Sequence, residues 1–245
     1  NFKYNETGTT LSKGELETVV RNAIINFDNA NLNNFDSIFR HSNLVKSIDD
    51  SDSAILSNIS NIRLRKRKPI VLDKSEGLVI EFGNGFFHPH DGHNKDGGGV
   101  LSTTGFKVDG DSVNTYFFDD DGNGNLRVFY LSGGEKLFYN QQAGKIDYEN
   151  GVITVGAIHI SAVSDVDGAT STRIRVTALP DSNDIIPVRN QTLEIDQVNT
   201  VIDGRVDTAA TTGAGFTTTT TTTAGVTTTT TTVSTAPSTP SSSAY

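Results

Sequence analysis

The sequence contains no cysteine, no methionine and no tryptophan. The absence of cysteine excludes a disulfide framework and thiolate chemistry. No apolar run approaches the roughly 20 residues that a membrane-spanning helix requires. The first ten residues also lack the charged and apolar regions of a signal peptide. We therefore expect a soluble chain, and because it starts without methionine, we expect it to be the C-terminal part of a longer polypeptide.

The charge balance is acidic, with a formal net charge of -9 at pH 7. Nucleic acids and anionic membranes bind basic surfaces that displace their counterions, so neither is an expected partner. The one dense positive run is RLRKRK at residues 63–68. Any basic contact is therefore expected to be local.

Residues 12–50 have the pattern of helices. Ser12 and Glu15 form a capping box, and an apolar stripe follows at helical spacing. The stripe consists of Leu16, Val19, Val20, Ala23, Ile24 and Phe27. A run rich in asparagine at 29–34 predicts a break, and the apolar groups at 35–39 and 44–48 predict one or two short helical turns. We expect Ser42 to cap the second of these turns.

From residue 54 the apolar period changes towards two, which predicts a strand. Ile62 and Leu64 would share one face of this strand, and Arg63, Arg65 and Arg67 the other. The order helix, short helix, strand predicts a small α+β unit over residues 1–70, with the helices on one face of a sheet.

Residues 71–200 are predicted to form a β-rich, sandwich-like region. Short runs rich in β-branched and aromatic residues alternate with clusters of Gly, Asn and Asp. The predicted strands are 78–82, 115–118, 126–131, 136–139, 153–160, 173–179 and 191–195. The pair Asn150-Gly151 is the strongest hairpin signal in the chain.

Residues 201–245 form a low-complexity, Thr-rich tail. Threonine runs at 217–223 and 227–232 are each introduced by a similar tripeptide, which gives a ten-residue repeat. The tail has too little apolar surface to fold alone, yet β-branched threonine favours extended chain. We therefore predict that the tail is extended and adds a strand to a neighbouring subunit or to another copy of itself.

The segment HPHDGH at 88–93 raises the question of a metal site. Closely spaced His88, His90 and His93 resemble the zinc-binding loop of metallohydrolases. In that loop an aspartate comes immediately before the third histidine, whereas here Gly92 separates Asp91 from His93. We therefore favour a Gly-rich polar loop and predict no metal here.

The segment DDDGNGN at 119–125 raises the same question for calcium. Asp119, Asp121, Asn123 and Gly124 match positions 1, 3, 5 and 6 of a calcium-binding loop. Position 12, which requires a bidentate glutamate, is Tyr130, and the flanking segments are predicted strands. A tight turn accounts for the same residues, and we prefer it.

The basic run at 63–68 has two interpretations: a solvated strand face, or a charged ladder that meets an acidic patch on another subunit. We prefer the second. The sequence shows no Ser-His-Asp order, phosphate-binding loop or dinucleotide fingerprint. It therefore predicts no catalytic residue and no cofactor.

Several strings resemble a known family. Residues 21–67, HPHDGH, STTGF, FFDDDGNGNLRVFY, AGKIDYENGVITV and IIPVRNQTLEI closely resemble, in the same order, the C-terminal region of the large baseplate wedge protein of T-even-type contractile-tailed phages, in cyanophage-like versions. The segment from helix to strand also resembles the end of the wider baseplate J family. The resemblance covers about residues 15–197. The Thr-rich tail has no counterpart in it.

This resemblance implies a structural protein of the virion whose copies pair and join wedges into a ring around the central hub. It implies no catalytic residue. The expected partners are the chain itself and other baseplate wedge and hub proteins, with host cytoplasm as the place of assembly. We hypothesise that residues 12–68 make the self-association contacts while the β-rich region meets other baseplate proteins. The hypothesised interface residues are Val19, Ala23, Phe27, Phe35, Phe39, Arg63, Arg65 and Arg67.

Two alternatives remain open at this point. The first is a metal-dependent hydrolase that uses the HPHDGH loop. The second is a host-binding adhesin, which the mucin-like tail and the β-rich body both suggest.

Overall fold

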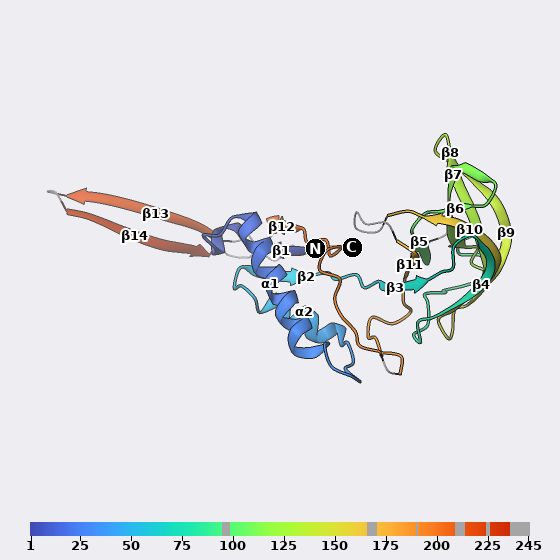
Figure 1. Ribbon diagram of the computed structural model, residues 1–245. Coiled ribbons are helices and arrows are strands. Elements are labelled where there is room, and N and C mark those ends of the chain that lie inside the picture. Colours follow the sequence, from blue (N-terminus) through green and yellow to red (C-terminus); the bar gives the residue numbers. More distant parts are fainter. Residues whose placement is uncertain (95–98, 166–170, 190, 209–213, 224–225, 236–245) are drawn as a thin grey trace, which may run out of the picture. The chain divides into compact units, whose positions relative to one another are not determined.

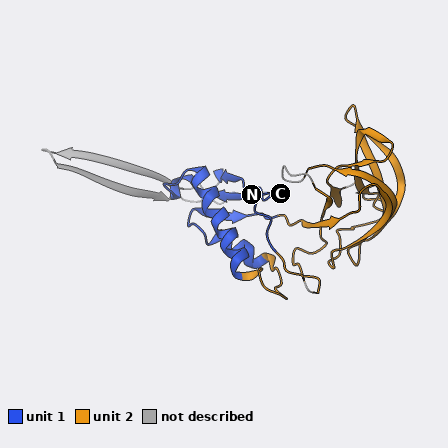
Figure 2. Ribbon diagram, in the orientation of Figure 1, with its two compact units in different colours: residues 1–30, 42–60, 194–245 blue, residues 31–41, 61–193 orange. Residues whose placement is uncertain are grey.

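The computed structural model describes residues 1–94, 99–165, 171–189, 191–208, 214–223 and 226–235 (Figure 1). The chain divides into two compact units (Figure 2). Unit 1 comprises residues 1–30, 42–60 and 194–245, and unit 2 comprises residues 31–41 and 61–193. Within the described residues, none of the helices combines the length and apolar character needed to cross a membrane.

Unit 1 combines two helices with a three-stranded sheet. Its elements are β1 (Phe2–Tyr4), the 3-10 turn η1 (Glu6–Gly8), α1 (Lys13–Asn31), α2 (His41–Asp49), β2 (Ile55–Asn58) and β12 (Gly204–Val206). β1 is the central strand, parallel to β12 and antiparallel to β2. The α+β character expected for the N-terminal region is present, although strands this short had no detectable alternation.

The capping box predicted at the start of α1 is confirmed. The Ser12 amide and hydroxyl both donate to Glu15 Oε2, at 2.8 and 2.7 Å. The hydrogen bonds from Ser12 lower the pKa of the Glu15 carboxyl. The apolar stripe faces inward, with Leu16, Val20 and Ile24 buried. The helix ends at Asn31, inside the predicted break.

The second helix differs in detail from the prediction. α2 begins at His41, so Ser42 is not its cap. Asp184 supplies the acceptor instead, because its Oδ1 receives the His41 amide at 2.9 Å. The predicted helical turn at 35–39 is absent; Phe39 forms a β-bridge with Ile185. A partner distant in sequence therefore determines both features, and local patterns could not predict them.

One face of the unit 1 sheet is covered and the other is open. Phe2 and Tyr4 are buried, while Lys3 between them is exposed. α1 is tied to the β12 side, because Lys13 Nζ lies 2.9 Å from Asp203 Oδ1 and the Gly204 amide donates to Glu17 Oε1 at 3.1 Å. The open face carries Lys3 and Arg205, which are partners in register.

Unit 2 contains two sheets. Its strands are β3 (Leu64–Pro69), β4 (Lys74–Glu81), β5 (Leu101–Thr103), β6 (Phe106–Val108), β7 (Asp111–Asp120), β8 (Asn125–Ser132), β9 (Glu135–Asp147), β10 (Val152–Val163) and β11 (Arg173–Ala178). The larger sheet has the order β4-β10-β6-β7-β8-β9 and the smaller the order β3-β11-β5. All of the pairings are antiparallel.

The larger sheet is strongly curved, because the first and last strands of its β6–β9 meander both pair with β10. β6 to β9 pair in succession. Both ends of this meander then pair with β10, β9 along 152–155 and β6 along 160–163. Because Val152–Val155 also pairs with β4, β4 lies on the other side of β10. Register shifts in β10 between these stretches let the strand bend.

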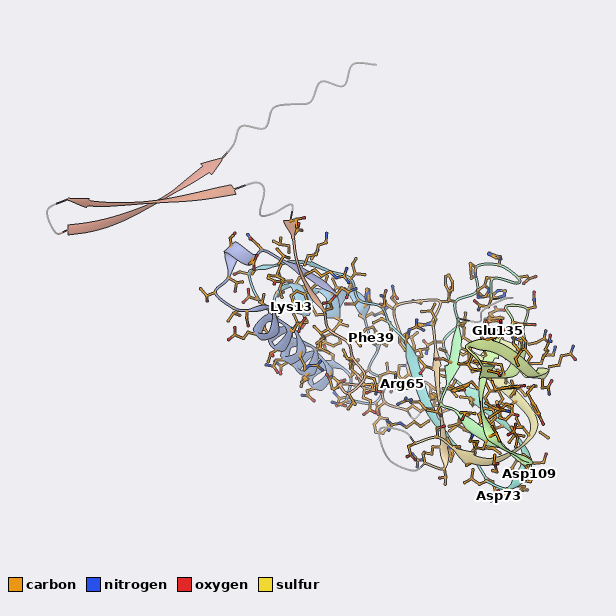
Figure 3. The ribbon with its side chains drawn as sticks, turned by 90° about the horizontal axis from the view of Figure 1, so that it is seen from above. Lys13, Phe39, Arg65, Asp73, Asp109 and Glu135 are labelled. Carbon is orange, nitrogen blue, oxygen red and sulfur yellow. The ribbon has the colours of Figure 1, made fainter. Side chains whose placement is uncertain are left out.

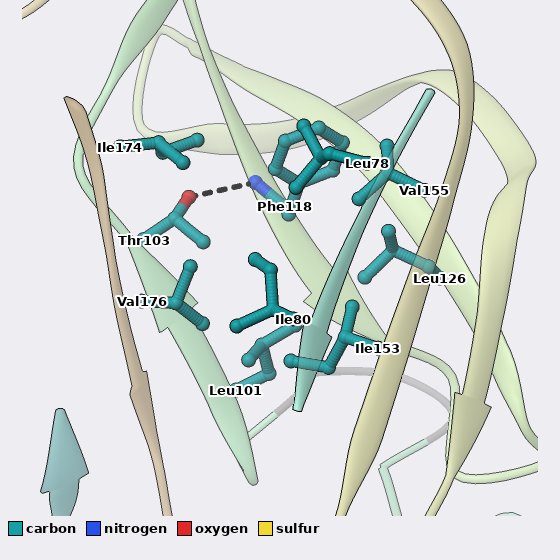
Figure 4. Close-up of a pocket in the computed structure, with 10 residues that line it drawn as sticks. All are labelled: Leu78, Ile80, Leu101, Thr103, Phe118, Leu126, Ile153, Val155, Ile174 and Val176. Carbon is teal, nitrogen blue, oxygen red and sulfur yellow. Dashed lines mark hydrogen bonds between the residues drawn. The ribbon is translucent and has the colours of Figure 1, made fainter. Parts of the chain in front are cut away.

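The inner faces of both sheets share one apolar core. The residues around a small gap in this core come from both sheets (Figure 4). They are Leu78, Ile80, Leu101, Thr103, Phe118, Leu126, Ile153, Val155, Ile174 and Val176. The Phe118 amide donates to Thr103 Oγ1 at 3.0 Å and so links β7 to β5. The sandwich-like expectation therefore fits this unit broadly.

Six of the seven strands predicted between 71 and 200 are confirmed as parts of β4, β7, β8, β9, β10 and β11. The strand predicted at 191–195 is wrong. Ile195 lies beside α1 instead, where its amide donates to Asp28 Oδ1 at 3.0 Å, and Gln197 O, two residues later, accepts from Arg21 at 3.2 Å.

The hairpin at Asn150-Gly151 exists, but its loop is longer than two residues. β9 ends at Asp147 and β10 begins at Val152, with these two residues paired. Of the Asn150-Gly151 pair, only Gly151 has a positive φ, of 64°. The Asp147 carboxylate accepts a hydrogen bond from the Asn150 amide. The loop is thus stabilised by a side chain, and the two-residue turn that this dipeptide favours is not formed.

The two units divide the chain differently from the expected boundaries at 70 and 200. β3 was expected in the N-terminal domain but pairs with β11 in unit 2. Residues 194–208 return to unit 1, where β12 pairs with β1. Pairing between segments far apart in sequence explains both differences.

The described part of the Thr-rich tail is extended. β13 (Ala214–Thr223) and β14 (Val226–Thr235) pair antiparallel, from Ala214 with Thr235 to Thr223 with Val226. Residues 209–213, 224–225 and 236–245 of the tail lie outside the described residues. An isolated two-stranded hairpin is marginally stable in water. Strand addition to a neighbour or to another copy therefore stays a prediction.

Because β13 pairs with β14, we predict that residues 209–245 add no stability to the isolated chain. Truncation after Thr208 is expected to leave the thermal unfolding midpoint unchanged. Truncation after Val201 is the comparison, because it also removes β12 and the Asp203 ion pair with Lys13, and it should lower the midpoint. An equal loss in both truncated chains would show that residues 209–245 stabilise unit 1.

Candidate functional site

The two polar loops predicted from the sequence lie against each other in unit 2. Gly122 O accepts from the Gly92 amide at 2.8 Å and from His88 Nε2 at 3.1 Å. Gly122 has a φ of 74°, and a Cβ there would lie 2.7 Å from the Asn94 nitrogen. The sequence predicted two separate loops and gave no signal that they meet. The close approach requires glycine at this position.

Each histidine of the 88–93 loop has at least one ring nitrogen in contact with a neighbouring polar group. His88 Nε2 faces Gly122 O, and His90 Nδ1 faces Asp91 O at 3.0 Å. His93 Nδ1 faces His90 O at 2.9 Å, while its Nε2 lies 2.9 Å from Asn94 Nδ2. A ring nitrogen that faces a carbonyl carries the proton, so that nitrogen is not a metal ligand, although the other nitrogen of the same ring keeps its lone pair. These contacts favour a folded polar loop.

Asp120 joins both loops to the sheet from a fully buried position. Its carboxylate accepts hydrogen bonds from Asn94 Nδ2, from the Leu101 amide at 3.2 Å and from the Tyr148 hydroxyl at 3.1 Å. Tyr148 in turn stacks on His88, with ring centroids 4.2 Å apart. Burial, and then the charge of Asp120, raise the pKa of the Tyr148 hydroxyl above its usual value. The hydroxyl therefore stays protonated and keeps donating.

Asp119 makes a second buried network on the same strand. It accepts from Arg127 Nε at 3.0 Å and Nη2 at 2.9 Å, and from Lys136 Nζ at 2.7 Å. Arg127 is buried and lies over the Phe138 ring, while Lys136 lies over Phe129. A buried carboxylate held by two cations is a structural feature whose loss is costly.

The calcium-loop match is not reproduced by the positions of the carboxylates. Asp119 is committed to Arg127 and Lys136, whereas Asp121 Oδ1 accepts from the Asn123 and Asn125 amides at 2.7 and 2.9 Å. Desolvation opposes ionisation of Asp121, but the hydrogen bonds from Asn125 and Asn123 outweigh it and lower the pKa of the carboxyl. Across the described residues, no group of three or more His, Asp or Glu side chains could hold a metal ion.

Residues 1–67 match the family described as baseplate structural protein gp6, C-terminal domain III. This match supports a structural protein of the phage tail baseplate, and therefore of the virion. It also suggests a non-enzymatic role and contact with other baseplate components. The comparison with curated proteins finds no match to the chain.

The gp6-type region contains all eight hypothesised interface residues, and the structure distributes them between interior and surface. Phe27 and Phe39 are buried, so both stabilise the fold and are not available to a partner. Phe35 is 73% exposed. Val19 and Ala23 are half-buried on α1.

The three arginines lie on or beside β3, where Arg65 is labelled in Figure 3. Arg63 and Arg67 are exposed, and Arg65 Nε lies 3.4 Å from Thr177 Oγ1 on β11. Between them, Lys66 lies over the Phe82 ring and donates to Glu81 O. Burial lowers the pKa of the Lys66 ammonium. The charge of Glu81 acts to raise this pKa, and the charge of Lys68 lowers it further. The basic run at 63–68 therefore has some side chains that are exposed to solvent and others that contact the rest of unit 2.

Replacement of Gly122 by alanine tests the contact between the loops. Gly110→Ala is the matched control, because Gly110 also has a positive φ but nothing lies within 4 Å of an added Cβ. We expect the control to destabilise the protein by about 1–2 kcal/mol through backbone strain. Gly122→Ala should cost roughly 1–3 kcal/mol more through steric overlap, measured by urea denaturation. Equal costs would contradict the close packing.

We predict that the 88–93 loop binds no zinc, because within the described residues its three histidines do not form a group that could hold a metal ion. Elemental analysis of the purified chain after dialysis should find only background zinc, with or without the combined substitutions His88→Ala, His90→Ala and His93→Ala. Added zinc should leave the thermal unfolding midpoint unchanged. One zinc ion per chain that disappears in the triple variant would instead favour the metallohydrolase alternative.

Proposed function

We propose that the chain is a wedge component of a contractile phage tail baseplate that associates with itself and joins wedges into a ring around the hub. The observation that carries this proposal is the match of residues 1–67 to the gp6 domain. Other wedge and hub proteins are the proposed further partners. Assembly in the host cytoplasm, before incorporation into the virion, is part of the same proposal.

Exposed apolar side chains support self-association through residues 12–68. Phe35 and Ile59 are 73% and 67% exposed, and large apolar side chains at interfaces contribute much of the binding energy. We propose that Phe35, together with the exposed parts of Val19 and Ala23, contacts a second subunit. Arg63, Arg65 and Arg67 are proposed to meet acidic groups, which would favour one pairing of subunit faces over others.

The β-rich unit 2 is proposed to present a rigid surface to other baseplate proteins. Asp120 holds Asn94 of the histidine loop, and Asp119 links β7 to Arg127 of β8 and Lys136 of β9. A preorganised surface binds with a smaller loss of conformational entropy than a flexible one. In this proposal the polar residues of the loops maintain shape and take no part in a reaction.

Phe35→Asp tests self-association directly. The wild-type chain should show concentration-dependent association in analytical ultracentrifugation. Loss of about 1.5–3 kcal/mol of apolar burial predicts a dissociation constant higher by roughly tenfold or more.

Val113→Asp is the control, because Val113 is 84% exposed and lies on β7 of unit 2. It makes the same change of polarity outside residues 12–68 and should leave association unchanged. A wild-type chain that stays monomeric at high concentration would contradict the proposal, as would equal effects of the two substitutions.

A further inference from the structure

A groove of about 270 Å³ lies in unit 2 beside β4. Its lining includes the apolar side chains of Ile70, Leu78 and Ile158. Residues 68–71 also line the groove, and Asp73, labelled in Figure 3, lies in the turn that joins β3 to β4. The Asp73 amide donates to Ile160 O at 2.9 Å, which anchors this turn to β10. The groove is therefore built by strands and a fixed turn.

The strand beside the groove is the last in its sheet. Within the described residues, β4 pairs with β10 on one side only, and β3 likewise pairs only with β11. An edge strand exposes backbone donors and acceptors to which an extended chain can pair. Val71 and Val79 also line the groove and are 56% and 43% exposed. The region thus offers both an open strand edge and apolar side chains.

The charges around the groove favour an acidic partner. Two lysines, Lys68 and Lys74, line the groove, whereas its lining contains one carboxylate, that of Glu76. Glu76 Oε1 lies 3.5 Å from Lys74 Nζ. Lys68 also ends the basic run of β3, in a chain whose net charge is -9. The net charge of the chain disfavours acidic partners in general, whereas the two lysines of this groove favour them locally.

The size of the groove favours side chains of a segment over a whole ligand. Sites for drug-sized molecules usually measure about 300–1,000 Å³ and enclose most of the ligand. At about 270 Å³ this groove is smaller and open to solvent. Alternate side chains of an added strand point to the same face, so apolar ones would enter the groove while carboxylates reach the lysines.

We propose that the groove and the edge of β4 bind an extended acidic segment of a different protein chain by strand addition. This proposal rests on the proposed function, since a baseplate supplies such neighbours. The partner segment alternates apolar and acidic residues over about the length of β4. Backbone pairing provides affinity, and the two lysines select for acidic sequences.

A binding experiment with the purified full chain tests the chemistry. The probe is a fluorescent eight-residue peptide, matching the 8 residues of β4, in which valine alternates with glutamate. A second peptide alternates valine with lysine. Fluorescence anisotropy should detect binding of the acidic peptide alone, and the binding should weaken as salt rises. Absence of binding, or equal binding of both peptides, would overturn the proposal.

Substitutions locate the site on the chain. Lys68→Glu combined with Lys74→Glu should weaken binding of the acidic peptide about tenfold, because two exposed ion pairs become repulsions. Lys3→Glu combined with Lys46→Glu makes the same change of charge in unit 1 and should have little effect. Equal losses would mean that net charge, and not the groove, determines binding.

Cross-linking in assembled particles identifies the occupant. A benzophenone side chain placed at Val79 should cross-link to an acidic segment of another baseplate protein, whereas one placed at Val113 should not give that product. A cross-link from Val79 to a second copy of this chain would overturn the proposed occupant. If the chain does not enter baseplates at all, the proposed function fails; if it enters but Val79 gives no cross-link, only the groove proposal fails.

Discussion

The buried carboxylate of Asp120 is the constraint on which the arrangement of unit 2 depends. It accepts hydrogen bonds from Asn94, Leu101 and Tyr148, which belong to three separate segments of the chain. A buried carboxylate without such donors would be strongly destabilising, so all three segments must be in place together. Asp119, next to it, holds Arg127 and Lys136. Two adjacent residues of β7 therefore hold side chains from several other segments of unit 2 in place.

This arrangement explains why the most polar strings in the sequence need not indicate chemistry. The histidines at 88–93 and the aspartates at 119–121 both resemble ligand sets, and the structure uses them to satisfy each other and the backbone. We propose that the functional surfaces lie elsewhere, on exposed apolar residues and on the edges of the sheets. An assembly protein requires such surfaces to be rigid when a partner arrives, because ordering them on contact would reduce affinity.

The sequence predicted those features that depend on local periodicity. The Ser12 capping box, the stripe of α1 and most long strands of unit 2 follow from spacing alone. Features that depend on distant pairing could not be predicted: the cap that Asp184 provides for α2, the return of β12 to β1, and the membership of β3 in the second unit. Three-residue strands also carry too few residues to show alternation. For the candidate site, the two polar loops could be predicted from the sequence, but the contact between them could not.

The central claim is that this chain acts through the surfaces it buries against neighbouring subunits. Electron cryo-microscopy of the intact phage particle tests it most directly, since the density would show where the chain lies and what covers it. We expect repeated copies around the tail axis within the baseplate, with the exposed residue Phe35 covered by a second subunit. A chain located outside the baseplate, or one whose surfaces all face solvent there, would contradict the account.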